Sequence, residues 1–230
     1  MTIALFSDIH ANLPAFEVML KDMDCRKPDV VFCLGDLIGY HIWPNEVIEM
    51  IRQRGIATLT GNHDMKTTGY AYEMVLADHR KYLSTLPARI KLEYQFVSSR
   101  WNIVLAHGST RSVNEYVLED LDENYVLEMM NEANADILCI GHSHKPYHRI
   151  INCNGNLKHV INIGSVGKPK DGNTMGCWVL LTIDENIAVD GKDALGVDFI
   201  RFEYDVERAT KAIEESPLPD ELADRLRKAY

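Results

Sequence analysis

Residues 56–64, Ile-Ala-Thr-Leu-Thr-Gly-Asn-His-Asp, join a short apolar run to a run of polar residues. The apolar part, Ile56–Leu59, is typical of a buried strand, and Gly61-Asn62-His63-Asp64 follows where that strand would end. Asn62 offers a neutral carbonyl oxygen to a metal ion, and His63 titrates near neutrality and can donate a proton. An Asx-turn would explain one such residue, but four in a row favour a functional loop.

The same order of apolar run, polar loop and amphipathic stretch occurs three times in the first half of the chain. Apolar runs alternating with segments of helical spacing predict strands that alternate with helices. The expected strands are Ile3–Phe6, Val30–Leu34 and Ile56–Leu59, and the expected helices are Leu13–Met23, Glu46–Arg52 and a longer one over Tyr70–Leu86.

Beyond Ile90 the pattern changes to a series of strands with few helices. The expected strands are Lys91–Val97, Trp101–Ala106, Ile137–Ile140, Tyr147–Cys153, Leu157–Ile163, Cys177–Ile183 and Asp198–Tyr204, and the expected helices are Leu121–Asn131, Val206–Glu215 and Asp220–Lys228. No linker or repeat interrupts this order, so we expect one α/β domain over residues 1–230 with a mixed sheet system.

Metal-ligand residues follow four further apolar runs. Asp8-x-His10 and Gly35-Asp36 come after the first two, and His107-Gly108 and Gly141-His142-Ser143-His144 come after two later ones. Taken singly, the first fits a helix cap beside a surface histidine and the second an ordinary turn. Because ligand sites of open α/β sheets lie at the carboxyl ends of the strands, five such clusters predict one shared site. Imidazole ligands favour zinc, iron, manganese or nickel over calcium and magnesium.

The overall composition is that of an ordinary globular protein and excludes several classes of function. The chain has 230 residues, 46% of them hydrophobic and 25% charged, and a net charge of -10, which disfavours binding to long nucleic acids. Its five cysteines have no CxxC spacing, so we expect buried thiols rather than disulfides. We find no leader-like start and no apolar stretch of membrane-spanning length, and we therefore expect a cytoplasmic protein. Its oligomeric state is left open.

These motifs, in this order, resemble the calcineurin-like metallophosphoesterases over most of the chain. Two later segments, His107-Gly108-Ser109 with Arg111 and the run 162–172, resemble the compact bacterial and archaeal phosphodiesterase-like branch of that family. The resemblance implies a four-layer α/β/β/α sandwich of two mixed sheets flanked by helices, with two metals at one edge.

The resemblance also implies a role for each motif residue. One metal would be held by Asp8, His10, Asp36 and His144, and the other by Asp36, Asn62, His107 and His142. Asp36 would bridge the two ions. His63 would bind neither ion and would instead approach the leaving-group oxygen or the phosphate.

Two motifs depart from the family pattern. Many relatives have a second aspartate three residues after the bridging one, followed by a phosphate-binding arginine, and this chain has Gly39 and Tyr40 there. His63 therefore lacks its usual carboxylate partner, and its orientation must come from elsewhere. In the late Asn-Pro-Gly-Ser pattern, Ile163 replaces the proline.

The mechanistic hypothesis is hydrolysis of a small phosphodiester by a metal-bound hydroxide, with two cations about 3.5 to 4 Å apart. His63 would protonate the leaving group, and Arg111, Lys168 and Lys170 are candidates for additional charge at the substrate. The alternatives are a phosphomonoesterase or nucleotidase, a diadenosine polyphosphate hydrolase, and a catalytically silent scaffold of the same fold.

We expect His41, His79, His148 and His159 to be surface or packing residues, although His41 lies close enough to the Gly39-Tyr40 turn to line the site. We expect Tyr70, Tyr72 and Tyr82 to pack in the core.

Overall fold

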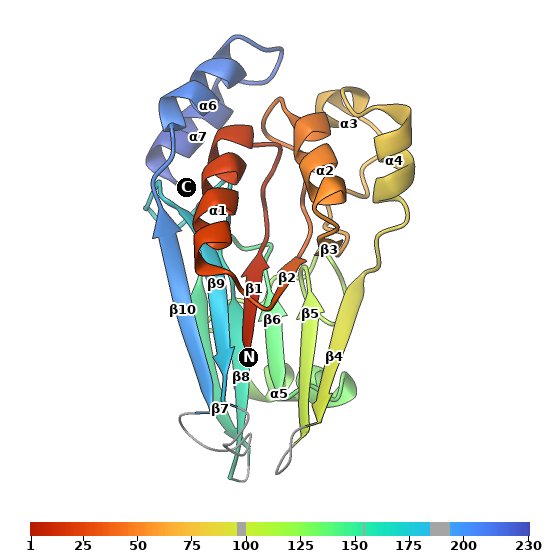
Figure 1. Cartoon of the computed structure of the whole chain (residues 1–230), viewed down its shortest axis with the longest axis vertical. Helices are drawn as coiled ribbons and strands as arrows, with labels where there is room; N and C mark the ends of the chain where they lie inside the picture. Colours follow the sequence, from red (N-terminus) through yellow and green to blue (C-terminus); the bar gives the residue numbers. More distant parts are fainter. Residues whose placement is uncertain (96–99, 154, 185–193) are drawn as a thin grey trace.

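The computed structural model describes residues 1–95, 100–153, 155–184 and 194–230, which form two five-stranded mixed sheets with flanking helices (Figure 1). The first sheet has the strand order β10-β9-β1-β2-β3. Its strands β1, β2 and β3 are parallel, whereas β9 pairs antiparallel with β1 and with β10. The bounds of these strands are Thr2–Phe6 (β1), Val30–Cys33 (β2), Ala57–Thr58 (β3), Gly176–Ile183 (β9) and Leu195–Phe202 (β10).

The second sheet has the strand order β4-β5-β6-β8-β7. The central strands β5, β6 and β8 are parallel, and β4 and β7 pair antiparallel at the two edges. The bounds of these strands are Arg89–Gln95 (β4), Arg100–Ala106 (β5), Ile137–Ile140 (β6), Tyr147–Cys153 (β7) and Asn156–Asn162 (β8). Of the expected strand 91–97, residues 96 and 97 lie outside the described part.

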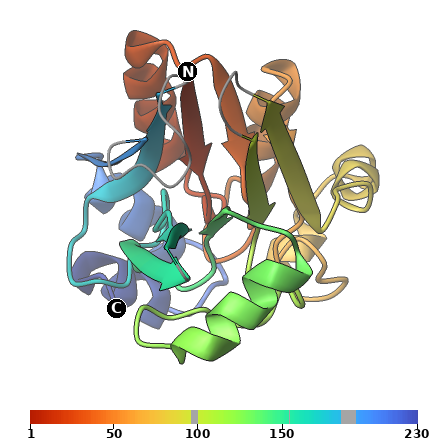
Figure 2. The ribbon, with the colours of Figure 1, turned by 90° about the horizontal axis from the view of Figure 1, so that it is seen from below.

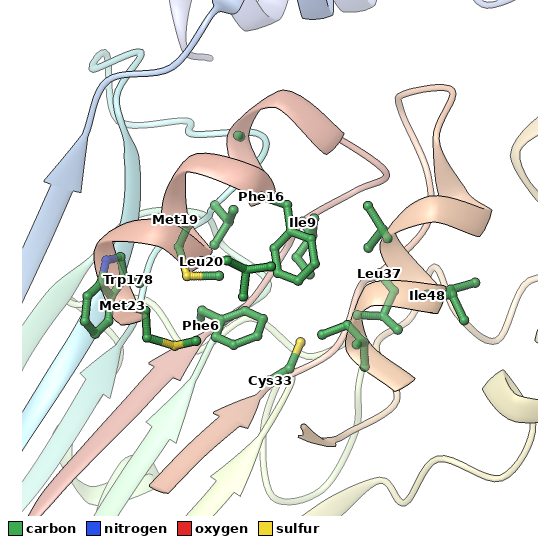
Figure 3. Packing of buried hydrophobic residues seen from close by; sticks show 14 of the residues in the cluster. Phe6, Ile9, Phe16, Met19, Leu20, Met23, Cys33, Leu37, Ile48 and Trp178 are labelled. Atoms are coloured by element: carbon green, nitrogen blue, oxygen red, sulfur yellow. The ribbon is translucent and has the colours of Figure 1, made fainter. Parts of the chain in front are cut away.

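Alternating side chains on β1 build two different cores. Ala4 and Phe6 pack with the helices α1 (Leu13–Arg26) and α2 (Pro44–Gln53), as Figure 3 shows for Phe6. Ile3 and Leu5 point the other way and pack between the two sheets. A strand that is buried on both faces explains why the sequence shows a continuous apolar run rather than alternation.

The second sheet repeats this arrangement with the opposite outer layer. Ile103 and Leu105 of β5 face the first sheet, and Val104 and Ala106 pack toward α5 (Glu123–Glu132). Figure 2 shows α5 on one side of the molecule and α1 and α2 on the other. The expected α/β/β/α sandwich is therefore confirmed.

One expected element is wrong. The segment 70–86 forms two short helices, α3 (Tyr70–Glu73) and α4 (Ala77–Leu83), rather than one long helix. The break comes at Leu76, whose backbone is extended and whose N–H donates to Asn45 Oδ1 at 2.9 Å. A side chain on another helix thus replaces the intrahelical acceptor, which helical spacing alone does not reveal.

Two helices remain, α6 (Val206–Glu214) and α7 (Glu221–Lys228). They lie at the end of the molecule to which β1 points (Figure 1). All five cysteines are free, as expected, but Cys25 is exposed and Cys153 half-buried, contrary to the expectation that all of them are buried. Among the described residues, we find no helix with the length and hydropathy needed to cross a bilayer.

Candidate metal centre

The structure brings all seven expected ligands together at one edge of the sandwich, just beyond the carboxyl ends of β1, β2, β3, β5 and β6 (Figure 1). The parallel strands of both sheets end on this side, so their following loops meet there. The first sheet contributes mainly oxygen donors and the second contributes imidazoles.

One cluster of donors consists of Asp8, His10 and His144, all of them buried. Oδ1 of Asp8 lies 3.5 Å from Nε2 of His10 and 3.1 Å from Nε2 of His144. The two Nε2 atoms lie 3.2 Å apart. Because all three atoms face one small space, they can bind the same cation.

A second cluster consists of Asp36, His107 and His142, with Asn62 beside it. Nε2 of His107 lies 3.4 Å from Oδ2 of Asp36 and 3.2 Å from Oδ1 of Asn62. The same Oδ2 of Asp36 lies 3.6 Å from Nε2 of His10 in the first cluster. Asp36 therefore stands between the two groups of donors.

The hydrogen bonds of the histidines favour a metal over a network of hydrogen bonds at this site. Nδ1 of His10 lies 3.0 Å from the Ile38 carbonyl oxygen, and Nδ1 of His144 contacts that of Lys168. A carbonyl only accepts, so Nδ1 carries the hydrogen and Nε2 of each neutral ring has a lone pair. Two lone pairs that face each other at 3.2 Å repel unless a positive charge lies between them.

The spacing of the donors and the local charge fit the same conclusion. Two ligands bound at about 2.1 Å to one ion lie about 3.0 to 3.4 Å apart, which is close to the donor separations of 3.1 to 3.6 Å. At His107, burial opposes a positive charge, but the Asp36 and Asp8 carboxylates outweigh it and raise the pKa to about 10. The two carboxylates thus favour a positive charge beside them at the second cluster.

Several ligands have backbone conformations that side chains rarely adopt. A φ between 52° and 64° is found at Asp8, His10, Asp36, His142 and His144. The left-handed region costs non-glycine residues of order 1 kcal/mol each, and such residues cluster at functional sites. Gly61 is required for a related reason, because a Cβ there would lie 2.1 Å from Asp36 Oδ1.

Asp64 holds the loops that carry the ligands, a role that we did not assign from the sequence. Its Oδ2 accepts from the N–H groups of Asp36 at 2.8 Å and Gly61 at 2.9 Å. Its Oδ1 accepts from Leu37 at 2.9 Å and Ile38 at 3.3 Å. One buried carboxylate therefore joins the loop after β2 to the loop after β3. The Gly-Asn-His-Asp loop contained the signal, since Asp side chains in loops often accept from nearby backbone N–H groups.

His63 lies beside the first cluster and is oriented without the missing aspartate. Nζ of Lys66 lies 3.1 Å from its Nδ1, and the Tyr40 ring lies 4.7 Å from its ring, centroid to centroid. Gly39 leaves room for this imidazole, because a Cβ there would lie 2.5 Å from His63 Nδ1. Burial lowers the pKa of His63 to about 4, and the charge of Lys66 contributes a smaller part of this shift. An ammonium only donates, so the neutral ring carries its hydrogen on Nε2.

The three basic candidates lie in different places. Lys168 is buried with Nζ 4.7 Å from the Tyr40 ring centroid, and burial followed by the charges of Lys170 and Arg225 lowers its pKa to about 8. Lys170 lies close enough to Asp8 and Asp36 for their charges to act on its pKa, which burial lowers. The structure does not bring Arg111 to the cluster, because its guanidinium forms two hydrogen bonds to Glu132, at 2.9 and 2.7 Å.

The other histidines have packing partners. His41 is buried, and its Nδ1 contacts the backbone oxygen of His10 at 2.9 Å, so it supports a ligand loop. His79 contacts Asn45 at 3.1 Å. His148 and His159 lie on the β7–β8 hairpin with Nε2 and Nδ1 3.0 Å apart.

With this geometry in view, the comparisons with known proteins decide the family. The model of the calcineurin-like phosphoesterase superfamily domain matches residues 1–186. The chain belongs to this superfamily. The resemblance found in the motifs is thereby confirmed, and metal-dependent hydrolysis of phosphoesters is the chemistry of this superfamily.

Three similar proteins cover nearly the whole length of this superfamily member. An uncharacterized protein of Methanocaldococcus jannaschii, MJ0912, is 29% identical over 97% of this chain and 96% of its own. The crystal structure of a metallophosphoesterase from Sphaerobacter thermophilus has a TM-score of 0.77 at 25% identity, with 100% of both chains covered. The hypothetical protein PH1004 from Pyrococcus horikoshii OT3 shares the fold, with a TM-score of 0.78 at 21% identity over 98% of this chain and 97% of its own.

Proposed function

We propose that this protein hydrolyses a small phosphodiester with a binuclear metal centre. One ion would be held by Asp8, His10, Asp36 and His144, and the other by Asp36, Asn62, His107 and His142. The observation that carries the proposal is that two groups of donors converge and share the Asp36 carboxylate. A shared carboxylate is the arrangement by which two cations are kept adjacent.

When bound there, two divalent cations supply Lewis acidity and a nucleophile derived from water at neutral pH. The protein contributes the rest of the chemistry through its own side chains. The backbone carbonyls that accept from Nδ1 of His10, His107 and His144 hold the imidazoles in one tautomer and orientation. His63 donates a hydrogen bond from Nε2 to an oxygen of the ester, and Lys170 adds positive charge next to the carboxylates.

The charge of the site supports a diester over a monoester. A monoester dianion gains most from several fixed cations, but Arg111 is occupied by Glu132. Lys168 is buried against Tyr40, which leaves Lys170 as the basic candidate nearest the carboxylates. A singly charged diester fits this supply of positive charge better.

The experiment that tests this proposal measures metal content and activity on the same samples. We expect two ions per chain by plasma emission and faster hydrolysis of bis(p-nitrophenyl) phosphate than of p-nitrophenyl phosphate with manganese. Asp36→Ala should lower kcat/KM by about 10³-fold or more, since several kcal/mol of transition-state stabilisation are lost. The matched control is Asp78→Ala, which removes an exposed carboxylate that pairs with Arg52 at the surface.

Each alternative function gives a different outcome. Faster turnover of the monoester would indicate a phosphomonoesterase or nucleotidase, and selective cleavage of diadenosine polyphosphates would indicate that class of hydrolase. A wild-type protein that binds two ions and hydrolyses none of these esters faster than Asp36→Ala does would indicate a scaffold. That outcome would refute the proposal.

A further inference from the structure

A cavity of about 220 Å³ opens beside His63, outside the two donor clusters. Its walls come from three distant parts of the chain: Tyr40 after β2, Tyr70 and Tyr72 of α3, and Leu218 before α7 with Leu222 in its first turn. The two leucines lie beyond residues 1–186 that match the superfamily model. This part of the wall therefore comes from the C-terminal segment outside the matched residues.

The lining has the character of a site for a flat apolar group. Tyr40, Tyr70, Tyr72, Leu218 and Leu222 are all half-buried, so part of each side chain faces the cavity. No carboxylate belongs to the lining. Half-buried aromatic rings with aliphatic side chains around them bind planar rings by stacking and edge contacts.

The Tyr72 ring is held in place. The Arg80 guanidinium lies 4.3 Å from its centroid and also donates to the Glu73 backbone oxygen at 3.0 Å. A wall that is already ordered loses little entropy when a ligand binds.

The cavity lies next to the metal centre. His63 lines it, and the His63 ring centroid lies 4.9 Å from that of His10, a ligand of the first cluster. Gly39 also lines it, and a Cβ at this position would lie 3.4 Å from His10 Nδ1. A phosphate held at the metal centre would therefore have this cavity beside it as space for one of its substituents.

We propose that this cavity, the ring pocket, binds a planar aromatic substituent of the phosphate ester, either a nucleobase or an aryl group. This inference rests on the proposed function, because the phosphate must lie at the metal centre. It names the class of substrate that the catalytic residues leave undetermined. The ring pocket has room for one ring system, and so it selects one substituent of the ester.

The test compares pairs of ligands that share the phosphorus group and differ only in the substituent. In the manganese-loaded protein, phenylphosphonate should inhibit hydrolysis of bis(p-nitrophenyl) phosphate with a Ki at least about 10-fold below that of methylphosphonate. Adenosine 5′-monophosphate against ribose 5-phosphate gives the same comparison for a nucleobase. Preference in both pairs identifies a nucleobase site, and preference in the phenyl pair alone identifies an aryl site.

Variants of the wall locate the effect. Tyr72→Ala and the cavity-filling Leu222→Trp should each bring the Ki ratio of the phenyl pair close to one and leave the Ki of methylphosphonate unchanged. Tyr72→Phe keeps the ring and should keep the preference. Equal Ki values within both pairs in an active wild type would overturn the inference alone. Absence of both bound metal and hydrolysis would overturn the proposed function itself, and the inference with it.

Discussion

Asp64 shows, at the scale of single residues, how a side chain outside the ligand set decides whether the ligands converge. Each of its two oxygens accepts from two backbone N–H groups, so all of its acceptor capacity faces the loops of Asp36 and Gly61. A carboxylate is the side chain that offers two acceptors with no donor. The geometry of the metal centre therefore depends on a carboxylate at position 64, which an amide cannot replace.

The isosteric change Asp64→Asn tests this dependence. Whichever way the amide is turned, its NH2 group faces two N–H donors, and those donors lose their acceptor at a cost of about 1–3 kcal/mol each. We expect a lower free energy of unfolding in urea and about 10- to 100-fold weaker manganese binding by titration calorimetry. Asp78→Asn is the matched control. Unchanged manganese affinity in Asp64→Asn would contradict this role.

At the scale of elements, the β7–β8 hairpin carries a pair of imidazoles, of which His159 is buried and His148 half-buried. Burial first and the neighbouring His148 second lower the pKa of His159 to about 4, and burial lowers the pKa of His148 as well. The neutral pair shares one hydrogen bond at 3.0 Å. Charging either ring opposes the packing of the hairpin.

This pair predicts a pH dependence of stability. Because the folded pKa of His159 lies below the unfolded value of about 6.5, the unfolded chain binds more protons between these two values. The stabilising contribution of neutral His159 is therefore present above pH 6.5 and is lost as the pH falls toward 4. After allowance for solvent screening, the loss is about 2 kcal/mol. Urea unfolding at pH 7.5 and pH 4.5 measures how far the free energy of unfolding falls with pH. We expect this fall to be smaller by about 2 kcal/mol in His159→Leu than in wild type. Equal falls in the two proteins would refute the contribution of His159.

The elements themselves were predictable from the sequence to a useful degree. The run Ile137–Ile140 matches β6 because a strand that is buried on both faces is apolar throughout. The break between α3 and α4 was not predictable, because the Asn45 side chain that satisfies Leu76 comes from α2. Local spacing reports which residues are apolar, and it carries no information on such partners from other helices.

At the scale of the whole molecule, metal binding should stabilise the fold. The donor clusters combine strained backbone with lone pairs and carboxylates that face one another, and cations relieve that repulsion. At a free manganese concentration of about 100 times Kd, the stabilisation is about 2.7 kcal/mol, or roughly 5–10 °C in Tm for a chain of this size. Calorimetry of the chelator-treated protein with and without manganese measures it. The same Tm rise in Asp36→Ala would place the ions elsewhere.

The position of the ligands at strand ends was predictable because parallel strands bring their carboxyl ends to one edge. The surroundings of the site were not. Leu218 and Leu222 are more than 140 residues from Tyr70 in sequence, and only the path of α6 and α7 brings them to the same cavity. Arg111 follows a motif histidine closely, but Glu132 on α5 holds it away from the cluster.

The division of the donors between the two sheets has one more consequence. The loops of the first sheet carry Asp8, His10, Asp36 and Asn62, and those of the second carry His107, His142 and His144. An oxygen-rich half-site thus meets a nitrogen-rich half-site only while the sheets stay docked. Any loosening of that interface would separate the two sets of donors before either sheet unfolds, so metal binding would report on the docking of the two sheets.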